Sequence, residues 1–262
     1  MEKKKIGVIG VGNMGGAIVA GIVKSGYTKP ANLFVSDRNP DVLKDIKKSG
    51  VQVSADNQYI VRNADMIIVA VKPWHIESVL KEIQPLLSSD KVILSIVAGV
   101  CLDDLARMAG RDIPIFRVMP NTAIALQESL TCISSNEELN IQRDDVVELF
   151  NHLGRTIEIP EDLMAAATAL SSCGIAYALR YIRAAMEGGI EIGFGAKMAQ
   201  LVVAQTVRGA AELILHAGNH PEQEIDKVTT PRGITITGLN EMEHNGFSSS
   251  VIQGILASYN KL

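Results

Sequence analysis

Cysteine is scarce in this chain, and no cluster of metal-binding residues stands out. The three cysteines, Cys101, Cys132 and Cys173, are widely spaced, which argues against a disulfide framework and against a C-x-x-C redox or zinc pair. They are typical of small buried residues in a reducing compartment. The histidines form no H-E-x-x-H pattern; His216 and His220 are four residues apart, but glycine and proline beside them end the helix. We therefore expect no metal site.

The chain also lacks an excess of positive charge. Its formal net charge of -4 predicts no basic surface for nucleic acid. Residues 6–23 follow a basic start and are nearly free of polar side chains, like a signal peptide, but six of these eighteen residues are glycine, which favours a strand, a turn and a helix in succession. No later stretch is expected to span a bilayer. The sequence thus predicts a cytoplasmic protein with no nucleic-acid or membrane partner.

A glycine-rich motif follows the first strand-like run, residues 5–9. It reads Gly10-Val11-Gly12-Asn13-Met14-Gly15 and opens an apolar helix, the context in which G-x-G-x-x-G binds a dinucleotide rather than forming a plain turn. The first glycine permits a tight turn, the second leaves room for the pyrophosphate, and the third lets helix and strand pack closely. We expect the phosphates on free N–H groups near Asn13, so the candidate cofactor-binding residues are Gly10, Gly12, Asn13, Met14 and Gly15.

An acidic residue, Asp37, follows the second strand-like run at the spacing expected for a ribose contact. Its carboxylate favours the 2′-hydroxyl of NAD and repels the 2′-phosphate of NADP, whereas Ser36, Arg38 and Asn39 are residue types that bind this phosphate. We expect Ser36, Asp37 and Arg38 to bind the cofactor. The choice between NADP and NAD stays open, and use of both is slightly favoured.

Short β-rich runs alternate with helical patterns as far as residue 160, which predicts βαβ units and a mostly parallel sheet. The expected strands lie near 5–10, 32–36, 50–53, 65–71, 91–97, 114–119 and 129–134. The expected helices lie near 13–25, 40–48, 55–63, 75–87, 101–109 and 142–153. Together with the glycine motif, this pattern indicates a Rossmann-type, doubly wound α/β domain over residues 1–160.

Residues 161–262 have no convincing strand and indicate an all-helical C-terminal domain, with the boundary near Pro160. Two of its stretches, 165–185 and 201–215, are apolar over much of the helix circumference. Because about 100 residues can hide little area, we expect this surface to meet a second subunit, although a large intrachain core is the alternative. The predicted assembly is a homodimer, or a larger homo-oligomer built from dimers.

Four further segments, in order along the chain, resemble those of the pyrroline-5-carboxylate reductase family. They are Ala70-Val71-Lys72-Pro73, Arg117-Val118-Met119-Pro120-Asn121-Thr122, Ala169-Leu170-Ser171 with Gly174-Ala176-Tyr177, and Val228-Thr229-Thr230-Pro231-Arg232-Gly233-Ile234-Thr235. The resemblance implies hydride transfer from NADPH or NADH to the imine carbon of 1-pyrroline-5-carboxylate, a small-molecule substrate, giving L-proline. Because the cofactor carries the hydride, no Ser-His-Asp or paired-carboxylate pattern is needed.

On the cofactor side, the segments at 70–73 and 119–121 fall at the carboxyl ends of expected strands, where open α/β sheets bind their ligands. The expected cofactor-binding residues there are Ala70, Val71, Lys72, Pro73 and Asn121. Asn121 could hold the nicotinamide amide or merely cap a loop. Lys72 could hold cofactor oxygens or be a solvated loop lysine.

On the substrate side, Thr229-Thr230-Pro231 predicts a helix start, whose N–H groups from Gly233 to Thr235 would face the substrate carboxylate. The resemblance implies that Thr235 hydrogen-bonds the ring nitrogen and helps to protonate it, as the candidate catalytic residue. The alternative is that these threonines only cap the helix. The expected substrate-binding residues are Thr230, Gly233, Ile234, Thr235 and Gly174.

The chain departs from the family pattern on the substrate side. It has Ser172-Cys173-Gly174-Ile175 where the family has G-S-G-P, and Arg232 and Ile234 where it has glycine and threonine or alanine. Two other interpretations therefore stay open: a β-hydroxyacid dehydrogenase-like enzyme and a non-catalytic dinucleotide-binding sensor. The first is disfavoured because Ala178 stands where its G-x-x-x-K segment would place the catalytic lysine. The retained Thr235 argues mildly against the second.

Overall fold

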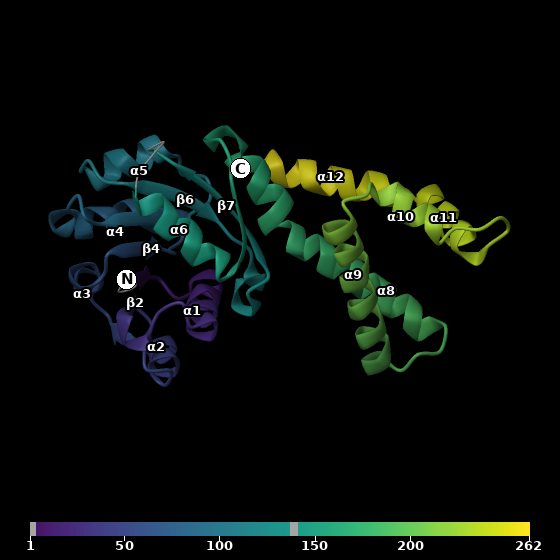
Figure 1. Cartoon of the computed structure of the whole chain (residues 1–262), viewed down its shortest axis with the longest axis horizontal. Coiled ribbons are helices and arrows are strands. Elements are labelled where there is room, and N and C mark those ends of the chain that lie inside the picture. The colour runs from purple at the N-terminus through teal and green to yellow at the C-terminus, as the bar shows by residue number, and fades with distance from the viewer. Residues whose placement is uncertain (1–3, 137–140) are drawn as a thin grey trace. The chain divides into compact units, whose positions relative to one another are not determined.

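The structure is a computed structural model that describes residues 4–136 and 141–262. Its residues form two compact units (Figure 1), and each is described separately. The first unit extends to Ser172 and includes Lys261–Leu262. The second comprises Cys173–Asn260.

The first unit is built on one sheet. Its strands are β1 (Ile6–Ile9), β2 (Leu33–Ser36), β3 (Gln52–Ser54), β4 (Met66–Val69), β5 (Val92–Ser95), β6 (Ile115–Met119), β7 (Ser129–Ser135) and β8 (Gly154–Glu158). They lie in the order β3-β2-β1-β4-β5-β6-β7-β8, and only β6 and β7 pair antiparallel. The predicted Rossmann-type, mostly parallel sheet is therefore confirmed.

Helices cover both faces of this sheet. They are α1 (Asn13–Ser25), α2 (Pro40–Lys47), α3 (Asn57–Asn63), α4 (Ile76–Ile83), α5 (Leu102–Ala109) and α6 (Ile141–Asn151). Ile18 of α1 and Phe150 of α6 belong to the core on one face, whereas Ile60, Leu80 and Leu105 of α3, α4 and α5 belong to the core on the other. Because β1 is followed by a helix on one face and β4 by helices on the other, a crevice opens between the carboxyl ends of these two neighbouring strands.

The edge strand β8 is absent from the strands expected from the sequence. Its sequence, Gly-Arg-Thr-Ile-Glu, contains one large apolar side chain, and three of the five residues are exposed, so the run lacks the apolar character of the strands inside the sheet. It pairs only with β7, from Ser129 opposite Gly154 to Ile133 opposite Glu158. A short, charged edge strand is recognised from its partner more than from its own sequence.

The first unit continues beyond Pro160 because polar contacts hold the following segment to the sheet. This segment has a 3-10 turn (Glu161–Leu163), α7 (Met164–Ala167) and a π-helical turn (Thr168–Ser172). Glu161 Oε1 accepts hydrogen bonds from the N–H of Leu102 at 2.6 Å and from Arg117 Nη1 at 2.9 Å. Ser172 Oγ donates to the carbonyl of Pro120 at 2.6 Å. The domain boundary near residue 160 stays a prediction about independent folding.

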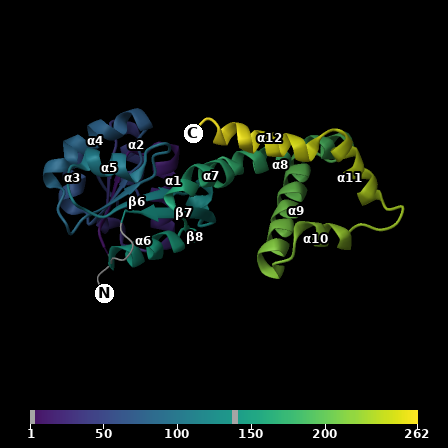
Figure 2. The same ribbon diagram turned by 90° about the horizontal axis from the view of Figure 1, so that it is seen from above.

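The second unit consists of helices only. They are α8 (Gly174–Glu191), α9 (Ala196–Ala217), α10 (Pro221–Lys227), α11 (Ile234–His244) and α12 (Phe247–Tyr259). Helices α8 and α12 lie side by side (Figure 2), and the Tyr177 hydroxyl hydrogen-bonds Ser258 Oγ at 2.5 Å between them. In this unit only Ala199 is buried, and large apolar side chains along α8, α9 and α12 are exposed. Such a unit lacks a core of its own.

Residues 161–191 are long and apolar enough to cross a membrane by length and composition alone. The expectation that no stretch after residue 23 has these properties was therefore wrong. The run contains a 3-10 turn, α7, a π-helical turn and α8, and it carries the ion pair between Arg183 and Glu187. The same composition is expected of a helix that packs against another protein chain.

Candidate dinucleotide-binding site

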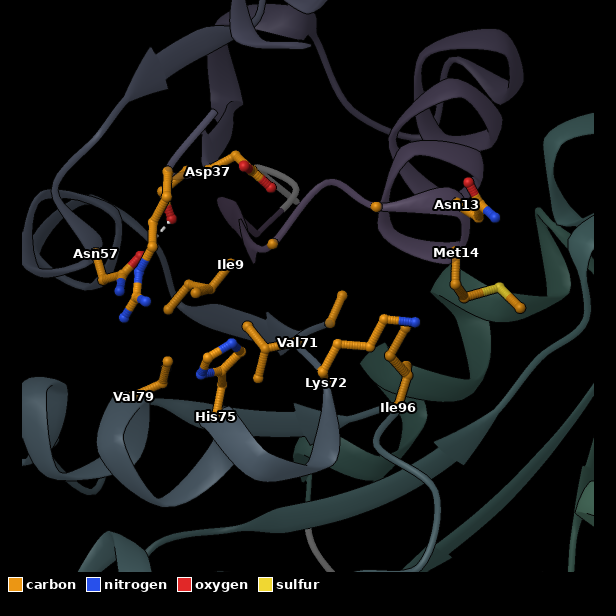
Figure 3. A pocket seen from close by; sticks show the side chains of 15 residues that line it. Ile9, Asn13, Met14, Asp37, Asn57, Val71, Lys72, His75, Val79 and Ile96 are labelled. Carbon is orange, nitrogen blue, oxygen red and sulfur yellow. Dashed lines mark hydrogen bonds between the residues drawn. The ribbon is translucent and has the colours of Figure 1, made fainter. Parts of the chain in front are cut away.

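A cavity of about 540 Å³ lies at the carboxyl ends of the strands, where the crevice between β1 and β4 opens (Figure 3). It gathers residues from the loops after β1, β2, β4 and β5 and from the start of α3 and α4. Its lining residues are Ile9, Gly10, Gly12, Asn13, Met14, Ser36, Asp37, Arg38, Asn57, Ala70, Val71, Lys72, His75, Val79 and Ile96. Ten of the predicted cofactor-binding residues are thus brought together.

The three motif glycines meet three different requirements. Gly10 has φ +92°, and a Cβ there would lie 2.7 Å from the carbonyl oxygen of Ala70. At Gly12 a Cβ would meet no protein atom within 4 Å, so this side of the loop is open. At Gly15 a Cβ would lie 2.1 Å from the carbonyl oxygen of Gly10, so helix and loop touch there. A tight turn, an open approach and close packing are what a dinucleotide loop needs.

The helix that leaves this loop presents its amino end to the cavity. Gly12 is the N-cap of α1, its backbone is extended, and no side chain caps the helix. The first turn contains no acidic residue. The N–H groups at Asn13 and Met14 therefore have no intrahelical acceptor, and the helix dipole adds partial positive charge. Backbone groups of this kind bind a pyrophosphate without any cationic side chain.

The half-buried Asp37 carboxylate ties two loops together. Its Oδ2 accepts a hydrogen bond from the N–H of Val11 at 2.7 Å, inside the glycine motif. Its Oδ1 accepts another from the N–H of Asn39 at 2.7 Å. Both carboxylate oxygens are therefore engaged with backbone, although each can accept a further bond. The side chain of Arg38 is exposed in the same cavity.

Ser36 borders the cavity but has no accessible surface. Its hydroxyl donates to Asn57 Oδ1 at 2.8 Å, and Asn57 Nδ2 donates to Glu82 Oε2 at 2.9 Å. Asn57 itself is half-buried and lines the cavity. Ser36 thus holds Asn57 in place. Of these two side chains, only that of Asn57 is accessible to a ligand.

The two ends of the cavity differ in chemistry (Figure 3). Asp37 and Asn57 lie at one end, whereas Lys72 extends at the other, where Met14 and Ile96 also lie. His75 lies between them, and its imidazole makes no hydrogen bond within the described part of the chain. A carboxylate and an amide thus mark the end beside β2, whereas Lys72, apolar side chains and Asn13 mark the other.

Three predicted cofactor-binding residues, Gly15, Pro73 and Asn121, do not line the cavity. Gly15 supports it from behind through the close contact with Gly10. Asn121 is buried, and its Oδ1 accepts the N–H of Ala123 at 3.1 Å, at the start of a 3-10 turn (Thr122–Leu126). Asn121 therefore caps a loop, which was the alternative interpretation. A contact with nicotinamide stays a prediction.

The sequence missed several lining residues, of which Asn57 and His75 carry polar chemistry. Asn57 follows the third strand, where nothing in its local pattern separates it from an ordinary helix-starting residue. The N-cap of α3 is Asp56, whose side chain accepts a hydrogen bond from the N–H of Gln58. The helix start is therefore capped without the side chain of Asn57. His75 comes three residues after Lys72, in a turn that returns the chain to the cavity, and this spacing was the available sequence signal.

On the substrate side the predicted helix start was wrong by several residues. Helix α11 begins at Ile234 with Gly233 as its N-cap, because the N–H of Gly233 donates to the carbonyl of Thr230 at 2.8 Å and closes a turn before the helix. The Gly233 N–H is therefore not free. Those of Ile234 and Thr235 start the helix without a side-chain cap, and both residues are exposed. The turn holds Arg232 at φ +62°, the conformation that glycine favours.

The remaining substrate-side residue, Gly174, opens α8, and a Cβ there would meet no atom within 4 Å. Its neighbour Cys173 has helical backbone angles and makes no capping hydrogen bond. Within the described residues no three His, Cys, Asp or Glu side chains gather into a metal-binding group.

Two family models match the chain in succession. Residues 5–99 match the NADP oxidoreductase, coenzyme F420-dependent family, and residues 161–262 match the pyrroline-5-carboxylate reductase dimerisation family. The second match covers the whole predicted helical domain.

Several curated relatives are pyrroline-5-carboxylate reductases, and their similarity extends over nearly the full chain. Pyrroline-5-carboxylate reductase 2 of Dictyostelium discoideum is 39% identical over 99% of this chain and 92% of its own length. The Escherichia coli enzyme is 34% identical over 97% and 95%. Pyrroline-5-carboxylate reductase 1 of Dictyostelium is 41% identical over 98% of this chain, which spans about half (49%) of that longer relative.

Solved structures agree with these relatives. A Plasmodium falciparum pyrroline carboxylate reductase with NADP bound has a TM-score of 0.91 at 33% identity, covering 100% of this chain and 97% of that one. The Coxiella burnetii pyrroline-5-carboxylate reductase has a TM-score of 0.88 at 30% identity, covering 99% and 97%. With similarity across both units and the expected glycine loop in place, the chain belongs to the pyrroline-5-carboxylate reductase family.

Proposed function

We propose that this chain reduces 1-pyrroline-5-carboxylate to L-proline with NADPH or NADH. The observation that carries the proposal is that the similarity to pyrroline-5-carboxylate reductases extends over both units, at 39% identity and 99% coverage. A match limited to the first unit would support dinucleotide binding alone, because many enzymes share that fold.

The cavity supplies the cofactor part of this reaction. The glycine loop and the amino end of α1 hold the pyrophosphate, and the end with Asp37 and Asn57 takes the adenosine ribose. The opposite end, with Lys72 and Ile96, takes the nicotinamide half. The bound cofactor supplies the hydride, so the chain's own task is to orient its ring and exclude water.

The helical residues supply the substrate part. The N–H groups of Ile234 and Thr235 hold the carboxylate, beside Thr230, Gly233 and Gly174, as the family resemblance implies. The Thr235 hydroxyl hydrogen-bonds the ring nitrogen. As the hydride reaches the imine carbon, that nitrogen gains the electron pair of the C=N bond and takes up a proton. A hydroxyl at this point stabilises the charge that changes on nitrogen.

We further propose that the chain works as a homodimer or as a larger assembly of dimers. Residues 161–262 match a dimerisation family, and the second unit buries only Ala199 among its side chains. A second copy would cover the exposed apolar faces of α8, α9 and α12 and provide the missing core. A cytoplasmic location and the absence of membrane or nucleic-acid partners stay predictions, which cell fractionation tests.

The direct test mixes purified protein with 1-pyrroline-5-carboxylate and either reduced cofactor. The proposal predicts loss of absorbance at the reduced nicotinamide band and formation of proline. Cofactor binding without any turnover would favour the non-catalytic sensor instead. Turnover of a β-hydroxyacid, but not of the imine, would favour the dehydrogenase.

Thr235→Val tests the catalytic assignment, because valine keeps the shape of threonine and removes the hydroxyl. Loss of one preorganised hydrogen bond in a water-excluded site costs about 2 to 4 kcal/mol of transition-state stabilisation. We expect kcat/KM for the imine to fall accordingly, with cofactor affinity and thermal stability little changed. Thr237→Val is the matched control, since its hydroxyl donates to the carbonyl of Gly233 one turn back in the same helix. Equal kinetics in the two variants would return Thr235 to a purely structural role.

A further inference from the structure

Glu82 lies outside the cavity lining but contacts it through Asn57. The carboxylate of Glu82, in α4, accepts a hydrogen bond from Asn57 Nδ2 at 2.9 Å. Asn57 is the first residue of α3, and its side chain lies at the same end of the cavity as Asp37 (Figure 3). The carbonyl of Glu82 also accepts from Gln58 Nε2 at 3.2 Å, so α3 and α4 are joined by two bonds at this point.

The charge of Glu82 fixes which way the Asn57 amide faces. An ionised carboxylate only accepts hydrogen bonds, so the NH₂ group of Asn57 must face Glu82. The amide oxygen then faces Ser36, whose hydroxyl donates to it at 2.8 Å. The flipped amide would place two acceptors against each other at Glu82, which is unfavourable. The single proton of the buried Ser36 hydroxyl is thereby committed to Asn57.

An amide held in this way suits a hydroxyl better than a phosphate. Asn57 keeps one N–H and one lone pair of its oxygen, and a ribose hydroxyl can both accept from the first and donate to the second. A phosphate ester dianion offers only acceptors, and the lone pair on Asn57 repels it. The nearby carboxylates of Asp37 and Glu82 add negative charge. Among the described residues that line this cavity, Arg38 and His75 are basic residues that can offset it, whereas Lys72 lies at the opposite end.

We propose that Glu82 is a positioning residue that sets cofactor preference. Acting through Asn57 and Ser36, it favours the 2′-hydroxyl of NADH over the 2′-phosphate of NADPH. Arg38 pulls in the opposite direction, which explains how one site admits both cofactors. This inference rests on the proposed function only in that the cavity binds the adenosine ribose of NAD(P)H.

Glu82→Gln is the decisive variant, because glutamine keeps the length, removes the charge and can present either a donor or an acceptor to Asn57. We expect the ratio of NADPH affinity to NADH affinity to rise roughly three- to tenfold, since one charge near a phosphate dianion is removed and the amide can turn its donor to the ligand. Both affinities are measured without substrate, by quenching or enhancement of cofactor fluorescence. The shift in the ratio should shrink as salt is raised.

Two further variants make the result specific. Glu77→Gln removes the same charge from the same helix, where Glu77 pairs with Lys81 rather than with Asn57, and we expect it to leave the ratio unchanged. Glu82→Asp keeps the charge, and we expect the wild-type ratio to be largely retained.

Three outcomes would overturn the inference: an equal change of both affinities in Glu82→Gln, the same ratio shift in Glu77→Gln, or a Glu82→Asp variant that behaves like Glu82→Gln. Failure of the wild-type protein to bind either cofactor would instead count against the proposed function. Glu82 is exposed, so we expect Glu82→Gln to fold normally, and its thermal unfolding, measured beside that of Glu77→Gln, checks this.

Discussion

Asp37 illustrates how a residue can be predicted correctly in place and incompletely in role. Its position after β2 predicts a ribose contact, and the side chain does line the cavity. The sequence could not reveal that both oxygens also hold the backbone of Val11 and Asn39, because these bonds depend on how two loops meet. Asp37 therefore fixes the glycine loop even before a cofactor binds.

The backbone of Arg232 has a conformation that a side chain disfavours. At its φ of +62°, a residue with a Cβ destabilises the folded state by about 1 to 2 kcal/mol relative to glycine. Glycine in turn stabilises the unfolded state by about 0.4 to 1 kcal/mol, because its backbone has more freedom there. We expect Arg232→Gly to raise the free energy of unfolding by about 0.5 to 1 kcal/mol. Gln127→Gly is the control: Gln127 has a similar φ of 69° in the first unit, so we expect a similar gain in unfolding free energy. A gain for Gln127→Gly alone, measured by denaturant unfolding, would show that the Arg232 side chain makes a compensating contact.

In the loop and helix after β1, alanine substitutions at different glycines should affect the stability of the fold and the affinity for the cofactor separately. In Gly12→Ala the new Cβ meets no protein atom within 4 Å, and alanine is a poorer N-cap than glycine, so we expect a loss of about 0.5 to 1 kcal/mol in unfolding free energy and a large loss of cofactor affinity. In Gly15→Ala it meets backbone at 2.1 Å, which we expect to destabilise the fold by about 1 to 3 kcal/mol.

Gly16→Ala is the matched control for both variants. Its Cβ would have ordinary contacts, the nearest at 3.7 Å, and alanine is favoured inside a helix by about 0.5 to 1 kcal/mol. We expect normal cofactor binding and slightly higher stability. Thermal unfolding and cofactor titration check all three variants. Normal binding by Gly12→Ala would contradict the placement of the pyrophosphate.

Elements with strong local patterns were predictable, and those that depend on partners were not. The central strands are apolar and buried on both faces, and the strand β4 (Met66–Val69) shows this directly in its sequence. The exposed edge strand β8 carries no such pattern. The start of α11 was placed too early because Thr229-Thr230-Pro231 has the composition of a helix start, yet Thr229 Oγ1 donates back to Ile225, at the end of α10. The N–H of Gly233 also donates to the carbonyl of Thr230, so local hydrogen bonds of the preceding helix and turn decide between two caps of similar strength.

At the scale of the whole molecule, the helical unit explains why the chain is expected to associate. Burial of a single small side chain cannot stabilise the unit of residues 173–260 alone, so its apolar faces require a partner. We expect light scattering to give at least twice the chain mass of 28.2 kDa. Leu201→Glu places a charge on α9 at a side chain that is 65% exposed, and we expect dissociation and loss of activity.

Leu126→Glu is the control for this experiment. Leu126 is equally exposed, at 65%, but lies in the unit that has its own core, so we expect its variant to keep the wild-type mass. An active monomer of the wild-type protein would contradict the proposed assembly.

The site as a whole was predictable where one segment carries its own chemistry and hidden where several segments must meet. The glycine motif and Lys72 could each be recognised from a short segment of the sequence. Asn57 and His75 come from different connections of the sheet, and Glu82 reaches the cavity only through Asn57. Their cooperation is a property of the fold, because neither spacing nor composition connects α3 with α4.

The proposed reaction transfers a hydride from a reduced nicotinamide to the imine carbon of 1-pyrroline-5-carboxylate. NADH or NADPH with deuterium at both C4 positions of the nicotinamide tests this step, and NMR locates the label in the product. Direct hydride transfer predicts deuterium on the proline ring carbon that is bonded to nitrogen and bears no carboxylate. Proline without the label, or cofactor that binds and is never oxidised, would contradict it.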